Sequence, residues 1–283
     1  MRSMVVVASL LVRPLAGSTP PAAPTTTFGG PPPRVGEDLM TDAQPIKSDL
    51  GVRVASAVVM VTVAGMALWL GGQWWKMFVV VVAVLCLGEF ARLIWKASTS
   101  FLVRIFGISG AILYVGLAGL TIAEMRHSWM HDASGYLGLV TVLAVVGVVI
   151  FTDIGAYFVG RTIGGPKIAP TISPSKTWAG LIGGMIFAAL WSTFALQLFL
   201  WAADTWINRE GIELFKIWAW APFSGAILAV VAQAGDFFES WLKRKAGVKD
   251  SSNLIPGHGG VFDRVDGLLP VVLISSIFHL RPF

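Results

Sequence analysis

Long apolar segments alternate with short polar connections along most of this chain, and the pattern predicts a series of membrane helices. Seven apolar segments stand out, at residues 54–70, 74–91, 105–123, 136–159, 178–203, 217–238 and 267–280. A helix needs about 20 residues to cross a bilayer, so the last segment is marginally short. Because a short or interrupted segment can conceal a further helix, the pattern predicts about seven to nine transmembrane helices.

Composition places the chain in the membrane class. It has 55% hydrophobic and 13% charged residues, whereas soluble domains have about 45–50% apolar and about 25% charged residues. Such an excess of apolar residues has to be buried in lipid. We therefore predict an all-α polytopic membrane protein whose membrane domain covers residues 51–283. Residues 1–50 are rich in Pro and Thr and are predicted to form a disordered N-terminal segment.

The basic residues predict the orientation of the helices. The net charge of +5 belongs to cytosolic loops in a membrane protein, where basic residues meet anionic lipid, so it does not indicate nucleic-acid binding. Lys and Arg concentrate in the second, fourth and sixth connections: Arg92, Lys96, Arg104; Arg161, Lys167, Lys176; Lys243, Arg244, Lys245, Lys249, Arg264. This alternation predicts that the three connections face the cytosol and that a polar site lies at that face.

Acidic residues at the ends of three predicted spans indicate a metal site. Asp153, Asp236 and Asp266 belong to different spans, and acids at membrane depth are costly enough to suggest a function. Asp236 and Glu239 are three residues apart, as are Asp263 and Asp266, which puts each pair on one helix face. Clustered carboxylates repel unless a cation or proton intervenes. Mg²⁺ suits them, because it takes one or two carboxylates together with substrate phosphate oxygens.

Two polar segments are suited to binding phosphate. The sequence PGHGG at 256–260 leaves backbone N–H groups free to approach an anion. The sequence SPSKTW brings Ser173, Ser175 and Lys176 to the start of a span, where a helix N-terminus attracts negative charge. An anionic substrate, a divalent cation and a membrane-embedded site together indicate phosphoryl or nucleotidyl transfer onto a lipid phosphate.

A structural interpretation of the same residues stays open at this point. The acids would then simply pair with Lys243, Arg244 or Arg264, and His258 would be a structural histidine. A transporter with a buried acidic site is a further alternative. It would place acids near the bilayer midplane in broken helices, whereas here the acids cluster toward one face.

The sequence SWLKRKAGVKDSSNLIPGHGGVFDRVD at 240–266 resembles the signature of phosphatidate cytidylyltransferases, also called CDP-diacylglycerol synthases. The pattern is Ser, Lys-Arg, Lys-Asp, Pro-x-His-Gly-Gly and Asp-Arg-x-Asp, and every element is present in order. The segments QAGDFFES, DIGAYFVGR and SPSKTW are also similar to the family. The similarity extends over residues 54–283. One departure is Ala179, where the family usually has Glu.

The resemblance implies a reaction of CTP with phosphatidate that yields CDP-diacylglycerol and pyrophosphate, with Mg²⁺ and with a second cation left open. It implies Asp236 and Asp263 as the main metal ligands, and Asp250 and Asp266 as further ligands or orienting groups. The residues implied to act in catalysis are Asp250, His258, Asp263 and Asp266, and those implied to bind phosphate are Ser173, Ser175, Lys176, Lys243, Arg244, Lys249, Gly259, Gly260 and Arg264, with His258 beside them.

The implied location is a bacterial inner membrane with the site on its cytosolic side, membrane lipid is a partner, and a homodimer is left open. An alternative activity is a CTP-dependent kinase of a polyprenol, phytol or dolichol type lipid alcohol, in which the alcohol attacks the γ-phosphorus. The complete His-Gly-Gly and Asp-Arg-x-Asp pattern argues against the kinase, and a product assay separates the two, because the kinase releases CDP.

Overall fold

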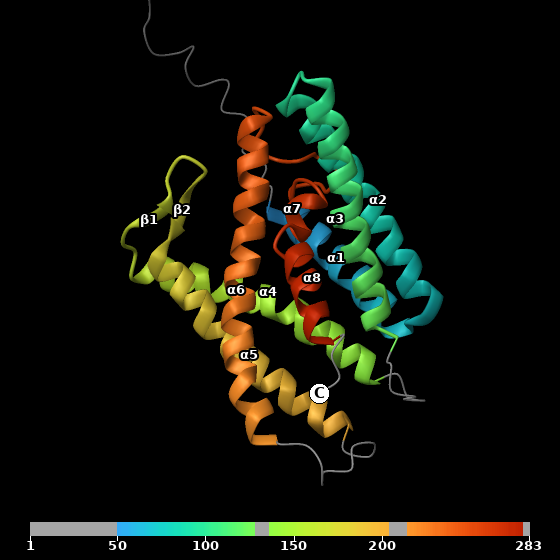
Figure 1. Ribbon diagram of the computed structural model, residues 1–283, viewed down its shortest axis with the longest axis vertical. Coiled ribbons are helices and arrows are strands. Elements are labelled where there is room, and N and C mark those ends of the chain that lie inside the picture. Colours follow the sequence, from blue (N-terminus) through green and yellow to red (C-terminus); the bar gives the residue numbers. More distant parts are fainter. Residues whose placement is uncertain (1–49, 128–135, 204–213, 280–283) are drawn as a thin grey trace, which may run out of the picture. The chain divides into compact units, whose positions relative to one another are not determined.

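Helices dominate the computed structural model, which describes residues 50–127, 136–203 and 214–279 (Figure 1). The helices are α1 (Leu50–Leu70), α2 (Gly72–Ala97), α3 (Phe101–Met125), α4 (Tyr136–Thr162), α5 (Trp178–Ala203), α6 (Leu214–Lys245), α7 (Phe262–Val265) and α8 (Leu268–His279). The Pro- and Thr-rich segment predicted to be disordered lies outside the described residues, apart from its last residue, Leu50.

Each predicted apolar segment falls within one helix, apart from the two ends of the last segment: Gly267 precedes α8, and residue 280 lies outside the described residues. Six helices in the described part of the chain, α1 to α6, are long and apolar enough to cross a membrane, and α8 is a shorter apolar helix. The chain is therefore an integral membrane protein with several candidate spans. The largest extension concerns α6, which continues past the predicted end at 238 to Lys245. The same continuous helix thus carries Asp236, Glu239 and Lys243 out of its apolar part.

The prediction of helices alone is wrong at one place. The strands β1 (Lys167–Ala169) and β2 (Ser173–Thr177) form an antiparallel hairpin between α4 and α5, in which Lys167 pairs with Thr177. The segment GGPKIAPTISPSKT contains two glycines and three prolines. These residues disfavour a helix, because proline lacks the N–H donor and glycine is costly to order. The second strand of the hairpin ends at Thr177, directly before the first residue of α5.

Small residues allow α4 and α5 to pack closely. A Cβ atom on Gly160 would lie 3.3 Å from Gly180 Cα, and one on Gly183 would collide with the side chain of Val159. Close approach of backbones through glycines is a common way to join helices in lipid. There the hydrophobic effect does not drive helices together, so close van der Waals packing has to do so. This contact fixes the hairpin relative to the end of α4, which carries Asp153.

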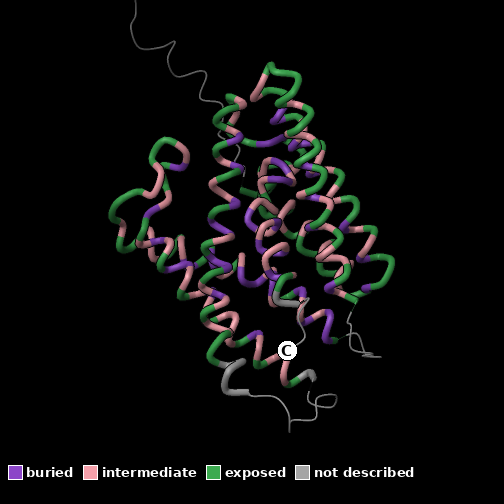
Figure 2. Tube along the Cα trace, in the orientation of Figure 1, coloured by how far each residue is buried: buried purple, intermediate pink, exposed green. Residues whose placement is uncertain are grey.

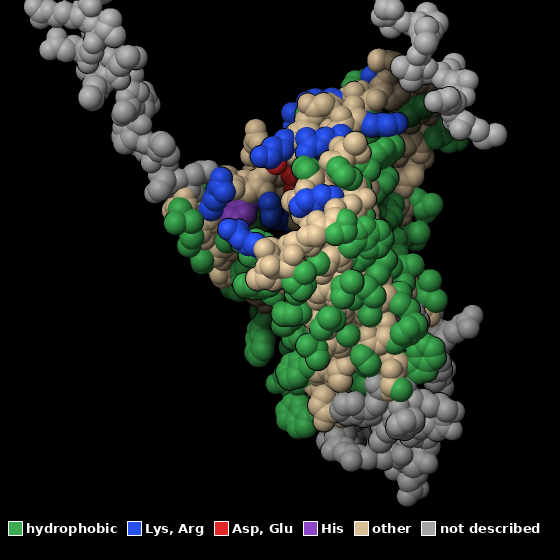
Figure 3. Space-filling model, turned by 90° about the vertical axis from the view of Figure 1, so that its left-hand side faces the viewer, with side chains coloured by type: hydrophobic (Ala, Val, Ile, Leu, Met, Phe, Trp, Pro, Cys, Tyr) green, Lys and Arg blue, Asp and Glu red, His purple; other side chains and the backbone are tan. Residues whose placement is uncertain are grey.

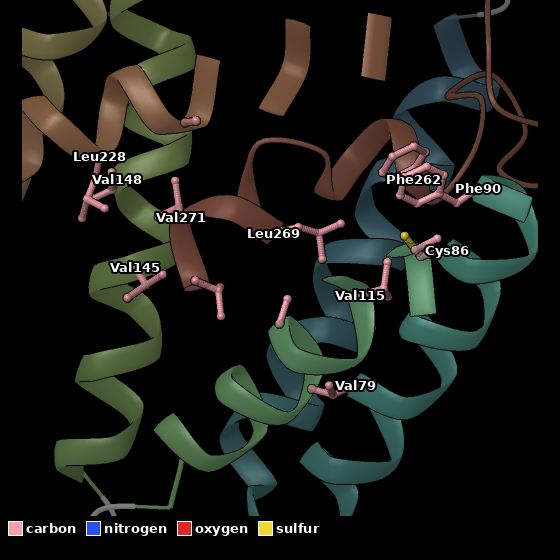
Figure 4. Packing of buried hydrophobic residues seen from close by; sticks show 14 of the residues in the cluster. Val79, Cys86, Phe90, Val115, Val145, Val148, Leu228, Phe262, Leu269 and Val271 are labelled. Carbon is pink, nitrogen blue, oxygen red and sulfur yellow. The ribbon is translucent and has the colours of Figure 1, made fainter. Parts of the chain in front are cut away.

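A second packed region joins α2, α3, α7 and α8 (Figure 4). The ring of Phe90 in α2 stacks on Phe262 in α7, with 4.7 Å between centroids and 18° between planes. Cys86 and Val115, each 1% exposed, lie beside this pair. The short α7, which carries Asp263, is therefore held against α2 by buried aromatic contact.

Apolar side chains also cover much of the outer surface, and Figure 2 shows exposed residues along the outside of the helices. Val61 is 73% exposed and Leu120 is 67% exposed. A monomeric soluble protein rarely exposes so extensive an apolar surface, and lipid is the solvent that fits it. At one end the surface changes: Figure 3 shows Lys and Arg side chains gathered around a hollow in which acidic side chains are visible.

The orientation of this polar end is testable with single cysteines. In a Cys86→Ser background, Thr171→Cys in the hairpin and Asn253→Cys before α7 introduce thiols at exposed positions. Because both segments belong to strongly basic connections, we expect both thiols to resist a membrane-impermeant reagent in intact cells and to react after permeabilisation. His127→Cys, exposed at the end of α3, is the control and should react in intact cells. Labelling of Thr171→Cys or Asn253→Cys in intact cells would contradict the predicted orientation.

Candidate functional site

The first part of the site lies where α6 leaves its apolar segment. Lys176, at the end of the hairpin, donates a hydrogen bond to Asp236 Oδ2 in α6. Its ammonium nitrogen also lies 4.9 Å from the centroid of the Phe237 ring. Asp153 of α4 and Asp266 lie close enough to Asp236 for their charges to interact with it. The structure thus brings together the three acids that the sequence placed at the ends of separate spans.

Asp263 forms the second part of the site, and hydrogen-bond donors surround its carboxylate. Its Oδ1 accepts from Lys243 Nζ at 2.7 Å, and its Oδ2 accepts from the N–H and the hydroxyl of Ser251, each at 3.0 Å, and from Gly260 N at 2.8 Å. Burial alone would raise the pKa of Asp263, but hydrogen bonds from neighbouring side chains and from these backbone groups hold the pKa below its ordinary value. Asp263 is therefore ionised at neutral pH.

The remaining acids crowd around these two carboxylates. Lys243 also contacts Glu239 Oε2 at 2.7 Å, and the other oxygen of Glu239 is buried without a hydrogen-bond partner among the described residues. Burial raises the pKa of Asp266, and the nearby charge of Asp236 adds to this rise. A carboxylate in this position gains stability from any cation that enters the site.

Glu89 organises the loop between α6 and α7, and sequence reasoning did not assign it a role. Its buried carboxylate accepts hydrogen bonds from Ser251 Oγ at 2.7 Å and Ser252 Oγ at 2.5 Å. It also accepts from the backbone N–H of Val261 at 3.0 Å and of Phe262 at 2.8 Å. An acid inside an apolar span was the available signal, but its partners are more than 160 positions away in the chain.

The glycine-rich turn packs against α1. His258 Nδ1 lies 2.8 Å from Ser56 Oγ, and Arg264 Nη2 donates to the His258 carbonyl at 2.6 Å. Gly257 and Gly259 have φ values of 74° and 83°, a conformation that favours glycine. In this structure His258 and Arg264 brace the turn, and their predicted contact with phosphate stays a prediction.

The predicted residues before α5 have different environments. Ser173 is buried, whereas Ser175 is exposed. Thr177 Oγ1 accepts a hydrogen bond from Gly180 N at 3.0 Å and so caps the start of α5. Ala179, where the resembled family has Glu, is half-buried in the first turn of α5. Only Lys176 of this segment contacts an acid of the site among the described residues.

The predicted residues at the start of the loop lie elsewhere. Lys249 and Asp250 line a pocket at the end of α2, together with Ser251, which also contacts Asp263. Arg244 is exposed near the end of α6. The structure therefore unites Asp236, Asp266 and Lys176 in one group, and Asp263, Lys243 and Gly260 in another. Lys249 and Asp250 line an adjoining pocket, and Asp250 and Asp263 both lie close to Gly259.

The charges of the site fit a divalent cation. Five acids lie in this part of the structure: Asp153, Asp236, Glu239, Asp263 and Asp266. Within the described ranges, the lysines that pair with them are Lys176 and Lys243, so the acids outnumber their basic partners. Among the described residues, no three His, Cys, Asp or Glu side chains converge to hold a metal ion. Mg²⁺ does not need such a cage, because it is commonly held by one or two carboxylates and by substrate phosphates.

Several known proteins are similar in sequence to this chain. Residues 111–280 match the Cytidylyltransferase family. The phosphatidate cytidylyltransferase of Brucella suis biovar 1 is 33% identical over 267 residues, which cover 82% of this chain and 93% of that protein. The phosphatidate cytidylyltransferase of Rickettsia bellii is 32% identical over 248 residues, with 86% and 97% covered. That of Haemophilus influenzae is 40% identical over 175 residues, with 62% and 56% covered.

The role of Glu89 is testable with Glu89→Gln. Each oxygen of Glu89 accepts from a backbone N–H, but glutamine has one acceptor oxygen and leaves a buried donor unsatisfied. We expect a loss of about 2 kcal/mol in stability, seen as a lower unfolding temperature in detergent. We also expect turnover to fall at least about tenfold, because the loop that carries Asp263 shifts.

Glu124→Gln is the matched control for this experiment. Glu124 lies near the C-terminal end of α3, its side chain is 54% exposed, and it pairs with Lys76 at 3.5 Å. Such surface pairs contribute little to stability. This variant should behave like the wild type. If Glu89→Gln were as stable and as active as the control, the loop would not depend on Glu89.

Proposed function

This chain belongs to the Cytidylyltransferase family, and we propose from this premise that it is a phosphatidate cytidylyltransferase. It joins CTP and phosphatidate to give CDP-diacylglycerol and pyrophosphate. The observation that carries the proposal is the grouping of Asp236, Asp266 and Lys176 beside Asp263 and Lys243 at the edge of the apolar helices. That place is where a lipid phosphate and a water-soluble nucleotide meet.

The chemistry requires positioning and charge neutralisation more than proton transfer. An oxygen of the lipid phosphate attacks the α-phosphorus of CTP, a new P–O bond forms, and the bond to the leaving pyrophosphate breaks. A phosphate monoester is already anionic near neutral pH, so no residue has to act as a general base. Fixed charges in a site with little water stabilise such a reaction strongly. Lys176 and Lys243 are the basic side chains that lie among the acids.

Asp236 and Asp263 are the proposed first ligands for Mg²⁺, with Asp266 as the next. The excess of acids over lysines, and a buried oxygen of Glu239 without a hydrogen-bond partner among the described residues, support a cation here. When bound, Mg²⁺ would supply positive charge that offsets charge on the two phosphates and on the leaving pyrophosphate. Asp263 also holds Ser251 and Gly260, so it combines a proposed ligand role with support of the loop. Asp250, which lies close to Gly259 as Asp263 does and lines the adjoining pocket, remains proposed as a further ligand or orienting group.

We further propose that this polar end faces the cytosol of a bacterium whose inner membrane holds the protein. Support comes from the excess of Lys and Arg in the three connections that this end contains. In this arrangement α8 would act as a seventh, shortened membrane segment beside α3 and α6. Phosphatidate then reaches the site from the lipid, and CTP reaches it from the cytosol.

The proposal is tested by pyrophosphate release from the full chain in liposomes that contain phosphatidate. We expect release that depends on both CTP and phosphatidate, and a fall of at least about 100-fold for Asp236→Asn and for Asp263→Asn. That fall equals about 2.7 kcal/mol of lost transition-state stabilisation. Glu124→Gln, far from the site, is the control. Release of CDP with a lipid alcohol in place of phosphatidate would instead indicate a lipid kinase.

The Mg²⁺ requirement separates a ligand from a residue that only supports the loop. A lost ligand raises the Mg²⁺ concentration that gives half-maximal rate, in addition to lowering the rate. A lost support lowers the rate and leaves this concentration unchanged. We expect the first result for both aspartates. A normal rate for Asp263→Asn at limiting Mg²⁺ would show that its carboxylate does not bind the metal and serves its structural contacts, such as the pairing with Lys243.

A further inference from the structure

A second group of basic side chains lies at the end of α2, outside the group of acids that faces Lys176 and Lys243. Arg92 and Lys96 are four residues apart on this helix, which puts both on one face. With Lys249 they line a pocket of about 190 Å³ whose other wall is the segment before α7. Figure 3 shows Lys and Arg side chains crowded at this polar end.

Hydrogen bonds hold the segment that lines this pocket in place. Ser251 and Ser252, which line it, both donate to the buried carboxylate of Glu89, one turn before Arg92 on α2. On the other side, the turn that ends α6 is closed by a hydrogen bond of 3.0 Å from Val248 N to Lys243 O. Lys249 follows this turn directly. The three cations are therefore brought together by the same contacts that position Asp263.

The charge of the pocket is not balanced by acids. Within residues 50–127, 136–203 and 214–279, no acid forms an ion pair with Arg92, Lys96 or Lys249. Asp250 is the acid that lines the pocket, and it leans on the glycine-rich turn, where a Cβ atom on Gly259 would lie 3.8 Å from its carboxyl carbon. Three positive charges against one negative charge create a local potential that attracts an anion.

The size and position of the pocket indicate the class of anion. Pockets for drug-sized ligands have about 300–1,000 Å³, so 190 Å³ suits a single phosphate group better than a whole nucleotide. Trp95, 59% exposed, and Phe101, 73% exposed, flank this end of α2, and Arg104 stacks on Trp95 at 3.9 Å. Aromatic and basic side chains together are typical of the level of lipid headgroups.

We infer that Arg92, Lys96 and Lys249 form a second phosphate-binding site, which holds the headgroup phosphate of an anionic membrane lipid. This lipid is distinct from the one that reacts, because none of the acids that pair with Lys176 or Lys243 lines this pocket. The inference assigns Lys249 to this site instead of to the reacting phosphates. A phosphate bound here joins the end of α2 to the segment 248–253, and so strengthens the wall that also supports Asp263.

The test uses the full chain in neutral detergent and a lipid that carries no phosphate monoester. Short-chain phosphatidylglycerol is titrated into the protein by calorimetry, with inorganic phosphate and short-chain phosphatidylcholine in parallel. The double variant Arg92→Gln/Lys96→Gln should bind phosphatidylglycerol about 30-fold more weakly, given the contribution of each basic residue near an anionic lipid. The control Lys167→Gln/Lys245→Gln removes two exposed charges outside the pocket and should bind as the wild type does.

Each outcome decides the inference. Phosphatidylglycerol binding that is lost only in the Arg92→Gln/Lys96→Gln variant supports it, and equally strong binding of inorganic phosphate would identify a free anion as the ligand. Equal affinity in both double variants, or no anion binding by the wild type, overturns it. The unfolding temperature without lipid checks the fold of the variant. If the double variant fails to fold, Lys96→Gln alone gives the same test with an expected loss of about fivefold.

Discussion

The burial of the Glu89 carboxylate is the interaction on which the proposed site depends. A charge within an apolar helix is stable only when donors replace the water that it has lost. Four donors from the segment 251–262 do so here, and two of them belong to the backbone at the start of α7. The same contact that satisfies Glu89 therefore fixes the loop, which in turn supplies the backbone N–H groups of Ser251 and Gly260 to Asp263.

A second constraint follows from the charges that this loop brings together. Asp263 and Glu239 share Lys243, while Asp236 has Lys176. The acids exceed the lysines, so the group is poised for a cation and for the phosphates that a cation binds. Its place at the end of α6, beyond the apolar part of the helix, allows a lipid and a nucleotide to approach together. The contacts that fix the loop after α6 therefore also position the acids of the proposed site.

Much of the fold was predictable because it depends on local composition. Apolar runs locate α1 to α6 well, since a helix satisfies its own backbone in lipid, and Asp153 of α4 and Asp236 of α6 do approach each other. The partners of Glu89 were not predictable, because its contacts join positions far apart in the chain. Arg264 shows the same limit: its hydrogen bond to the His258 carbonyl could not be predicted from residue type. Residue type indicates which hydrogen bonds a side chain can form, and tertiary packing determines which of them it does form.

The fate of each phosphorus atom of CTP tests the central claim most directly. Two samples of CTP, radiolabelled at the α- or at the γ-phosphorus, are incubated with the protein, Mg²⁺ and phosphatidate, and the lipid is then extracted into organic solvent. The account predicts that the α-label enters the lipid fraction and that the γ-label stays in water as pyrophosphate. A γ-label in the lipid fraction, with the α-label left in water, would contradict cytidylyl transfer.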